Sequence, residues 1–183
     1  MDIDWGAEVA DQLETHWQEL LRPRLDGLTD DEYFWQPVPG CWTLSRRGQS
    51  AAPLSLGAGD FTMDYQQPPP DPAPVTTIAW RLAHLSVGLA STSAKRFGQP
   101  AASEATYSFA GTAREALRQL DDEYAVFVAG VRGLGTGGLS QPQGEPPAFA
   151  EASLAKLMLY VNAEVIHHGA EICLLRDLYL QRT

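Results

Sequence analysis

A chain of 183 residues with 44% hydrophobic side chains can bury a sizeable core, and we expect a single domain over residues 1–183. Its formal net charge of −10 argues against binding to nucleic acid or to an anionic membrane, because both need clustered Lys and Arg. No apolar run approaches the roughly 20 residues that span a bilayer.

The N-terminus and the cysteines indicate in which cellular compartment we expect the protein. The first residues are acidic and amphipathic, which is unlike a signal peptide. Cys41 and Cys173 are the two cysteines, and the sequence holds no CxxC pair. We therefore expect free thiols in a reducing cytoplasm.

A first helix is predicted over residues 5–22, where apolar side chains recur at helical spacing. Pro23 should end this helix, because proline lacks a backbone N–H and clashes with the preceding turn. His16 lies beside the apolar row, and we interpret it as a partly buried or surface histidine rather than a ligand. The row consists of Trp5, Val9, Leu13, Trp17, Leu20 and Leu21.

Residues 26–73 are predicted to form a long irregular connection, with turns at Pro37, Pro39 and Gly40. Short extended pieces fit 41–45 and 61–65, and the stretch between them is small and flexible. A loop this long inside a compact domain is often functional. Its aromatic side chains either plug the open end of a helical bundle or line the mouth of a pocket. They are Tyr33, Phe34, Trp35, Trp42, Phe61 and Tyr65.

A second helix is predicted over residues 75–97, with a cap at Thr76 or Thr77. His84 lies in a row with Trp80 and Val87, directly beside the main apolar row, so it should face inward. A lone histidine there is more often a satisfied core residue than a ligand. The main row consists of Ile78, Leu82, Leu85 and Leu89.

A third helix should begin at the capping box Thr112-Ala-Arg-Glu115, after a loop over 98–110. Its buried side contains Leu117, Leu120, Tyr124, Phe127, Val128 and Val131. The following stretch GLGTGGLSQPQGEPP is interpreted as a glycine- and proline-rich linker. It lacks the GK[ST] ending of a phosphate-binding loop.

The last helix, over residues 150–182, carries polar side chains in its core-facing strip. His168 falls within the apolar row, and Glu164 lies four residues earlier on the neighbouring row. An unpaired buried charge costs several kcal/mol or neutralises by a pKa shift, so these groups need a partner. The apolar row consists of Leu154, Met158, Val161, Val165, His168, Ile172 and Leu175.

Four helices predict an all-α fold with little β structure, namely a four-helix bundle. The long irregular connection between the first and second helices has room for a short hairpin.

His84, Glu164 and His168 form the candidate metal site. Two ligands at i and i+4 on one helix and a third from a facing helix would leave a coordination position open, as in catalytic zinc sites. Nickel, cobalt or iron(II) also suit imidazole and carboxylate ligands. The alternative is a hydrogen-bonded Glu–His pair that holds no metal.

Other polar residues of the last helix have separate interpretations. His167 points about 100° away from His168, which favours a supporting or interface role over a ligand role. Glu171 could be a reserve ligand, a base, or a partner of Arg81 or Arg176. Asn162 is interpreted as an interhelical hydrogen bonder and Cys173 as inert packing.

The motifs TTIAWRLAHL around His84 and NAEVIHHGAEICLLRDLY around His168 resemble those of the DinB-like (DinB/YfiT-like) superfamily of metal-binding four-helix bundles. The segment LRPRLDGLTDDEYFWQPVPGCW resembles its actinobacterial branch. Many members carry His-x-x-x-His on the last helix, whereas this chain has Glu164 and His168. That departure is similar to mycothiol-dependent maleylpyruvate isomerases. By analogy, His84, Glu164 and His168 would hold zinc in an up-down-down-up or related bundle.

The resemblance also implies a function. Relatives are isomerases or S-transferases in which a metal activates mycothiol or bacillithiol as a thiolate. This chain ends soon after the last helix, so we expect a stand-alone, transferase-like bundle acting on a small-molecule substrate. The alternatives are a non-catalytic metal- or small-ligand-binding stress protein, and a bundle whose polar core residues only pair with each other. The superfamily often dimerises, which leaves a homodimer open.

Overall fold

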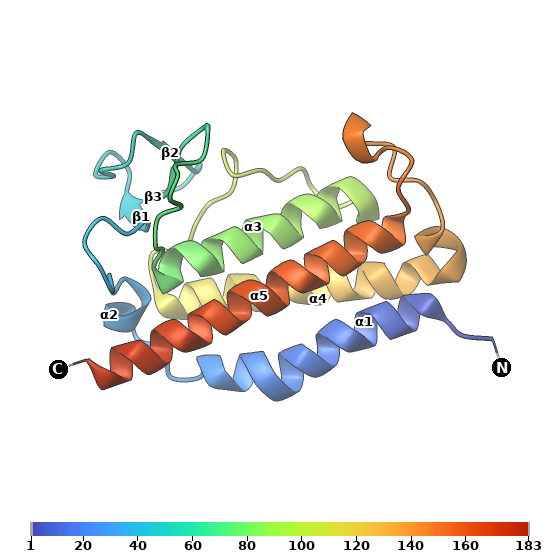
Figure 1. The fold of residues 1–183 in the computed structure, drawn as a ribbon, viewed down its shortest axis with the longest axis horizontal. Coiled ribbons are helices and arrows are strands. Elements are labelled where there is room, and N and C mark those ends of the chain that lie inside the picture. Colours follow the sequence, from blue (N-terminus) through green and yellow to red (C-terminus); the bar gives the residue numbers. More distant parts are fainter. Residues whose placement is uncertain (1, 183) are drawn as a thin grey trace.

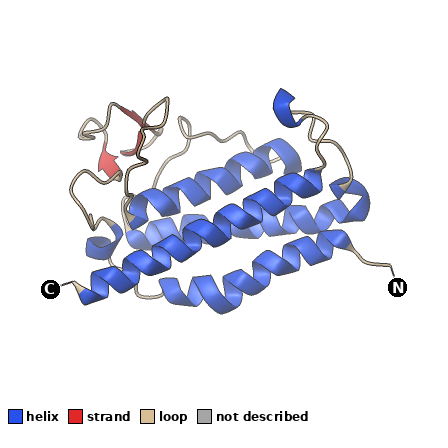
Figure 2. Cartoon of the chain, viewed as in Figure 1, coloured by secondary structure: helices blue, strands red, loops and turns tan. Residues whose placement is uncertain are grey.

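The protein is described by a computed structural model that covers residues 2–182. Most of the chain is helical, as predicted, and the strands form one small sheet (Figure 2). The α-helices are α1 (Trp5–Thr15), α2 (Asp30–Tyr33), α3 (Ile78–Phe97), α4 (Ala113–Leu139) and α5 (Leu154–Gln181). The strands are β1 (Leu44–Arg46), β2 (Leu54–Leu56) and β3 (Phe61–Tyr65). No described helix has the length and apolar character needed to cross a membrane.

The four long helices α1, α3, α4 and α5 lie side by side around one core (Figure 1). α3 and α4 run in the same direction, and α1 and α5 run in the opposite one. Parallel neighbours need a long connection, so residues 98–112 return along the molecule before α4 begins. α3 packs against both α4 and α5, which brings the two helices of the candidate site together.

Side-chain caps fix where the helices begin. The Thr77 hydroxyl accepts a hydrogen bond from the Trp80 amide at 3.2 Å, which confirms the cap of α3. Thr112 accepts from the Glu115 amide at 3.3 Å, so the predicted N-cap is present. Ser153 caps α5 in the same way. The Glu115 carboxylate accepts from the Thr112 hydroxyl at 3.0 Å rather than from its backbone amide, which differs from the predicted capping box.

The first helix continues further than predicted, in a different geometry. A π-helical turn (His16–Leu21) and a 3₁₀ turn (Arg22–Leu25) follow α1, and Pro23 lies inside the 3₁₀ turn. The wider π turn shifts the helical register, so Leu21 is buried whereas Leu20 faces solvent. Trp5, at the helix start, is 52% exposed, so Trp5 and Leu20 are members of the apolar row that lie outside the core.

The long connection contains three strands rather than a hairpin. β3 is central and pairs antiparallel with both β1 and β2, with Leu44 opposite Met63 and Leu54 opposite Tyr65. The Trp80 indole donates to the Asp64 carbonyl at 2.9 Å, which fastens the sheet to the start of α3. Tyr33 is buried and donates to the Ala110 carbonyl at 3.1 Å, so this aromatic plugs the core.

α4 also extends into the segment that was interpreted as a linker. The helix reaches Leu139, with one non-helical residue, Gly135, at φ 55°. Tertiary packing overrides the low helix propensity of glycine here, because Leu139 is 2% exposed and Thr136 accepts from the Trp5 amide at 3.2 Å. The Gly135 backbone also lies too close to Gly6 for a side chain at Gly6.

Candidate metal centre

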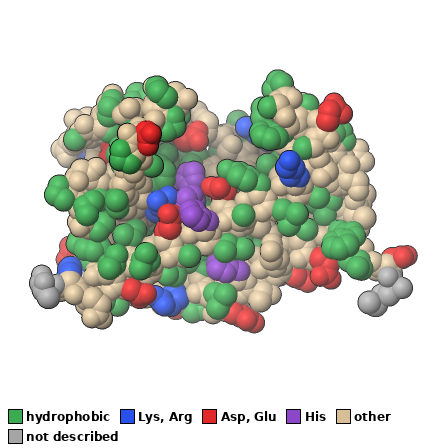
Figure 3. All heavy atoms as spheres, viewed as in Figure 1, with side chains coloured by type: hydrophobic (Ala, Val, Ile, Leu, Met, Phe, Trp, Pro, Cys, Tyr) green, Lys and Arg blue, Asp and Glu red, His purple; other side chains and the backbone are tan. Residues whose placement is uncertain are grey.

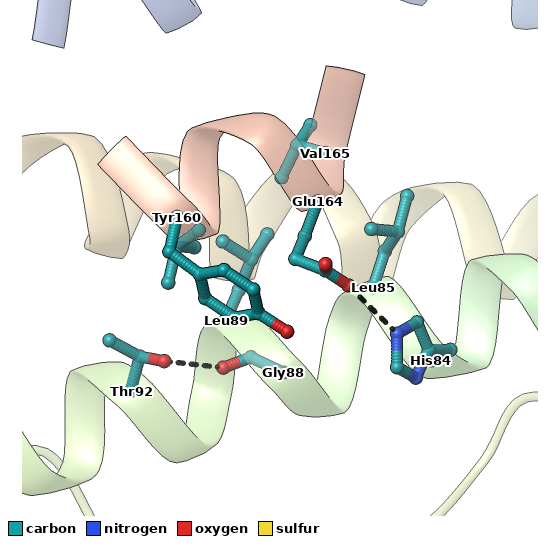
Figure 4. A pocket seen from close by; sticks show the side chains of 9 residues that line it. His84, Leu85, Gly88, Leu89, Thr92, Tyr160, Glu164 and Val165 are labelled. Carbon is teal, nitrogen blue, oxygen red and sulfur yellow. Dashed lines mark hydrogen bonds and ion pairs between the residues drawn. The ribbon is translucent and has the colours of Figure 1, made fainter. Parts of the chain in front are cut away.

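His84 reaches the site from the second turn of α3. Its ring stacks on the Trp80 indole, with centroids 5.2 Å apart and planes 13° from parallel. The His84 side chain is 35% exposed, so it lies at the edge of the core rather than within it. Stacking on Trp80 limits rotation of the imidazole, and its Nε2 atom faces α5 (Figure 4).

Glu164 and His168 approach from successive turns of α5. Glu164 Oε2 lies 3.5 Å from His84 Nε2 and 3.3 Å from His168 Nε2. One ligand atom from each of the three residues lies within 4.8 Å of the other two. The residues proposed from sequence as ligands therefore converge, with their ligand atoms facing a common point.

The other nitrogen of His168 is held by a carboxylate. His168 Nδ1 lies 2.6 Å from Glu171 Oε2, and Glu171 in turn accepts from Arg81 Nη2 at 3.1 Å. Arg81 Nη1 is also 3.0 Å from Nδ1, but arginine can only donate and a carboxylate can only accept. We therefore assign the proton to Nδ1, donated to Glu171, which leaves Nε2 as an acceptor.

This assignment places acceptors opposite one another. His168 Nε2 and Glu164 Oε2 both present lone pairs at 3.3 Å, a contact that needs a proton or a cation between the atoms. Burial lowers the pKa of His84, so its imidazole is neutral at pH 7. Imidazole nitrogens and a carboxylate oxygen are a donor set for zinc and related divalent ions.

The spacing fits such an ion as well. Tetrahedral zinc with bonds of about 2.0–2.2 Å holds its ligand atoms roughly 3.3–3.6 Å apart. The separations of 3.5 Å and 3.3 Å from Glu164 Oε2 fall in that range. A carboxylate on the outer nitrogen of a ligating histidine is the usual way to fix its tautomer, and Glu171 occupies that place.

The sequence of the chain matches a known protein family. A family model described as the DinB superfamily matches residues 12–172, which include His84, Glu164 and His168. The chain belongs to the DinB superfamily. This superfamily includes metal-binding proteins. Comparison with curated proteins and with solved structures gave no match.

A second cluster in this DinB-superfamily protein shares His168 and adds His167 and Glu171. His167 Nε2 is 3.6 Å from Glu171 Oε1, but the His167 side chain is 66% exposed. Glu171 is already neutralised by Arg81, whose guanidinium would repel a cation at this position. The cluster around Glu164 is therefore the better candidate for a metal site, with Glu171 placed to support His168.

A pocket of about 130 Å³ opens beside the centre, between α3 and α5 (Figure 4). Glu164 and His84 form its polar end, and Tyr160 and Thr92 lie further along its wall. Burial, with a contribution from Glu164, raises the pKa of Tyr160. The apolar part of the wall consists of Leu85, Leu89, Val161 and Val165. None of the aromatic residues of the first connection lines this pocket.

Sequence reasoning missed Tyr160 and Thr92, although a signal was present. Tyr160 is one helical turn before Glu164, and Thr92 is two turns after His84, so each lies on the ligand face of its helix. Of the two candidate partners of Glu171, Arg81 is the one in contact, whereas Arg176 binds Glu32 at 2.6 Å.

Two further expectations can be compared with the structure. Asn162 Nδ2 donates to the Val9 carbonyl at 2.8 Å and to Gln12 Oε1 at 3.0 Å, which confirms an interhelical hydrogen bonder. Cys173 is half-buried and packs against the core. Burial raises the pKa of the Cys173 thiol, which keeps it in the less reactive form.

Proposed function

We propose that this protein is a divalent-metal-dependent S-transferase that uses a low-molecular-weight thiol such as mycothiol. His84, Glu164 and His168 hold the ion, with zinc favoured over nickel, cobalt or iron. The directions of α3 and α4 against α1 and α5 support the predicted up-down-down-up four-helix bundle as the scaffold.

The observation that carries this proposal is the incomplete shell of three ligands at the end of a pocket. Structural zinc sites use four protein ligands, commonly cysteines, whereas three ligands leave a place for a substrate atom. When bound, the ion would lower the pKa of a thiol and hold it as the nucleophilic thiolate.

The side chains that line the pocket suit an electrophile as the second substrate. Leu85, Leu89 and Val165 keep water away from one side of the ligands, which strengthens electrostatic interactions there. The ordinary pKa of a tyrosine is 10, and burial raises the pKa of Tyr160 further, so its hydroxyl keeps its proton at neutral pH. It can therefore donate a hydrogen bond from Oη to an electrophile, at a carbonyl oxygen or a departing group.

A conjugation assay tests the proposal. Mycothiol and chlorodinitrobenzene are mixed with zinc-loaded protein, and thioether formation is followed by absorbance. We expect turnover that is lost on chelation and in Glu164→Ala. Asp177→Asn, which removes an exposed charge from the same helix, should retain full activity.

Absence of turnover across a panel of electrophiles and thiols, with one metal bound per chain, would overturn the transferase proposal. The second candidate, a non-catalytic metal- or small-ligand-binding protein, would then be favoured. One observation already supports that candidate. Besides His84 and Glu164, the wall of this pocket offers only Tyr160 and Thr92 as polar side chains.

A further inference from the structure

The pocket beside the metal ligands is one end of a longer groove. Two further hollows, of about 230 Å³ and 380 Å³, adjoin it along α3 and α5 toward the 140–153 connection. Thr92 lines both the first and the second hollow, and Tyr160 lines both the first and the third. Leu157 and Pro146 line both of the distal hollows. We call this continuous depression the α3–α5 groove.

The space-filling view shows the same shape from outside. Histidine side chains lie exposed in a hollow between two raised parts of the molecule (Figure 3). One raised part contains the β-sheet, and the other contains the connection between α4 and α5 (Figure 1). The α3–α5 groove therefore has metal ligands at one end and a raised wall at its distal end.

Both lysines of the chain lie at this distal end. The sequence contains only two, Lys95 and Lys156. Lys95 lines the second hollow and Lys156 the third, and both are exposed. Within residues 2–182, neither ammonium group has an ion-pair or hydrogen-bond partner, and Lys156 only lies over the Phe149 ring at 5.9 Å.

Several arginines differ from the two lysines. Arg22, Arg132 and Arg176 are each paired with carboxylates of neighbouring elements. In a chain with 23 acidic residues, two lysines that line adjoining hollows and have no carboxylate partner leave their positive charges available. This arrangement is expected where the partner is a ligand rather than the protein itself.

The wall around the lysines is fixed by Arg96. Its Nη1 donates to the Gln143 carbonyl at 2.7 Å, and its Nη2 donates to the Glu145 carbonyl at 3.1 Å. Arg96 thus adds a third positive charge while holding the connection against α3. Glu145 is the one acidic residue that lines this end, so the local balance remains positive in an acidic protein.

We propose that the α3–α5 groove binds an elongated small acid, with its metal-binding group at His84, Glu164 and His168 and its carboxylate between Lys95 and Lys156. This inference rests on the proposed function, because it assumes a metal at the three ligands. The helical rise sets the length of the ligand. From His84 to Lys95 along α3 is about 16 Å, and from Glu164 to Lys156 along α5 is about 12 Å. Leu89, Val161 and Leu157 give the middle an apolar floor.

The test uses ω-mercaptoundecanoate, whose extended chain is about as long as the groove, and the neutral mercaptoundecanol. Binding of each to the Co²⁺-loaded protein is followed by the thiolate-to-cobalt charge-transfer absorption. We expect the acid to bind about tenfold more tightly than the alcohol, the effect of two partly exposed ion pairs. The short acid 4-mercaptobutyrate, which is too long for a stable chelate ring, should show no such advantage over 4-mercaptobutanol, because its carboxylate cannot reach the lysines.

The preference should disappear in Lys95→Met/Lys156→Met. Arg118→Met also removes a positive charge, but from an exposed pair with Asp122 on α4, and should leave the preference intact. Equal binding of long acid and long alcohol in the unchanged protein would overturn the groove proposal, as would an unchanged preference in the double variant. Absence of the absorption with every thiol would instead contradict the metal centre, so the two failures can be distinguished.

Discussion

His168 connects the metal centre to the interior through its two ring nitrogens. Nε2 faces Glu164, and Nδ1 donates to Glu171, which is paired with Arg81. The negative charge of Glu171 makes the imidazole a better electron donor and fixes its orientation. Arg81 forms an ion pair with the Glu171 carboxylate, so this half-buried charge is not isolated.

Replacing Glu171 therefore tests the tautomer of His168. Glu171→Gln keeps the size of the side chain but removes the charge, and we expect metal affinity to fall by about 10–100-fold. A chromophoric chelator in competition with the protein measures the affinity. The matched control is Asp177→Asn, which breaks only the exposed pair with Arg24. Equal affinity in Glu171→Gln and the unchanged protein would show that Nδ1 is not held in this way.

His16 supplies a second prediction at this scale, far from the metal. Its Nε2 is buried without a hydrogen-bond partner, and burial lowers the pKa of His16 below its ordinary value of 6.5. As the pH falls through 6.5, the unfolded chain takes up this proton before the folded protein does, so the free energy of unfolding decreases.

Urea denaturation of His16→Gln at a series of pH values measures this effect. The variant should lose less stability on acidification than the unchanged protein, because it lacks the contribution of His16. Some loss should remain, because the pKa of His84 is also lowered. Parallel pH profiles for the two proteins would show that His16 does not titrate with folding.

At the scale of elements, the contact between α3 and α4 depends on a glycine. Gly130 packs directly beneath the Phe97 ring, so a β-carbon at this position would overlap it. Gly133 lies one turn further along α4, is exposed, and has open space where a β-carbon would be. The two positions share a helix but differ in packing.

Alanine should change the free energy of unfolding in opposite directions at the two positions. Gly130→Ala should destabilise by about 1–3 kcal/mol through overpacking. Gly133→Ala should stabilise by up to about 1 kcal/mol, since alanine is the better helix former. Both values follow from urea denaturation curves. If Gly130→Ala were as stabilising as Gly133→Ala, the close approach of Phe97 would be contradicted.

Some elements could be predicted from sequence and others could not, for physical reasons. The apolar row of α5 and the cap at Thr77 are local patterns, and both are present. β2 could not be predicted, because its three residues lie in a small-residue segment and become a strand only by pairing with β3. The end of α4 was missed because packing of Leu139 overrides its glycines.

At the scale of the whole molecule, α3 and α5 together form the candidate site. Sequence placed His84 and Glu164 in or beside apolar rows, which is why their convergence could be anticipated. The placement of Lys95 and Lys156 in adjoining hollows could not, because these residues are brought to one end of the α3–α5 groove only by the packing of α3 against α5. A homodimer stays a prediction.

The central claim is that one divalent ion binds between α3 and α5. Titration of zinc into metal-free protein against a chromophoric chelator tests it most directly. We predict one ion per chain, affinity reduced by more than about 100-fold in His84→Ala, and unchanged affinity in His167→Ala, since loss of a ligand exceeds the effect of an outer residue. Equally tight binding in His84→Ala, or loss of binding in His167→Ala instead, would contradict the account.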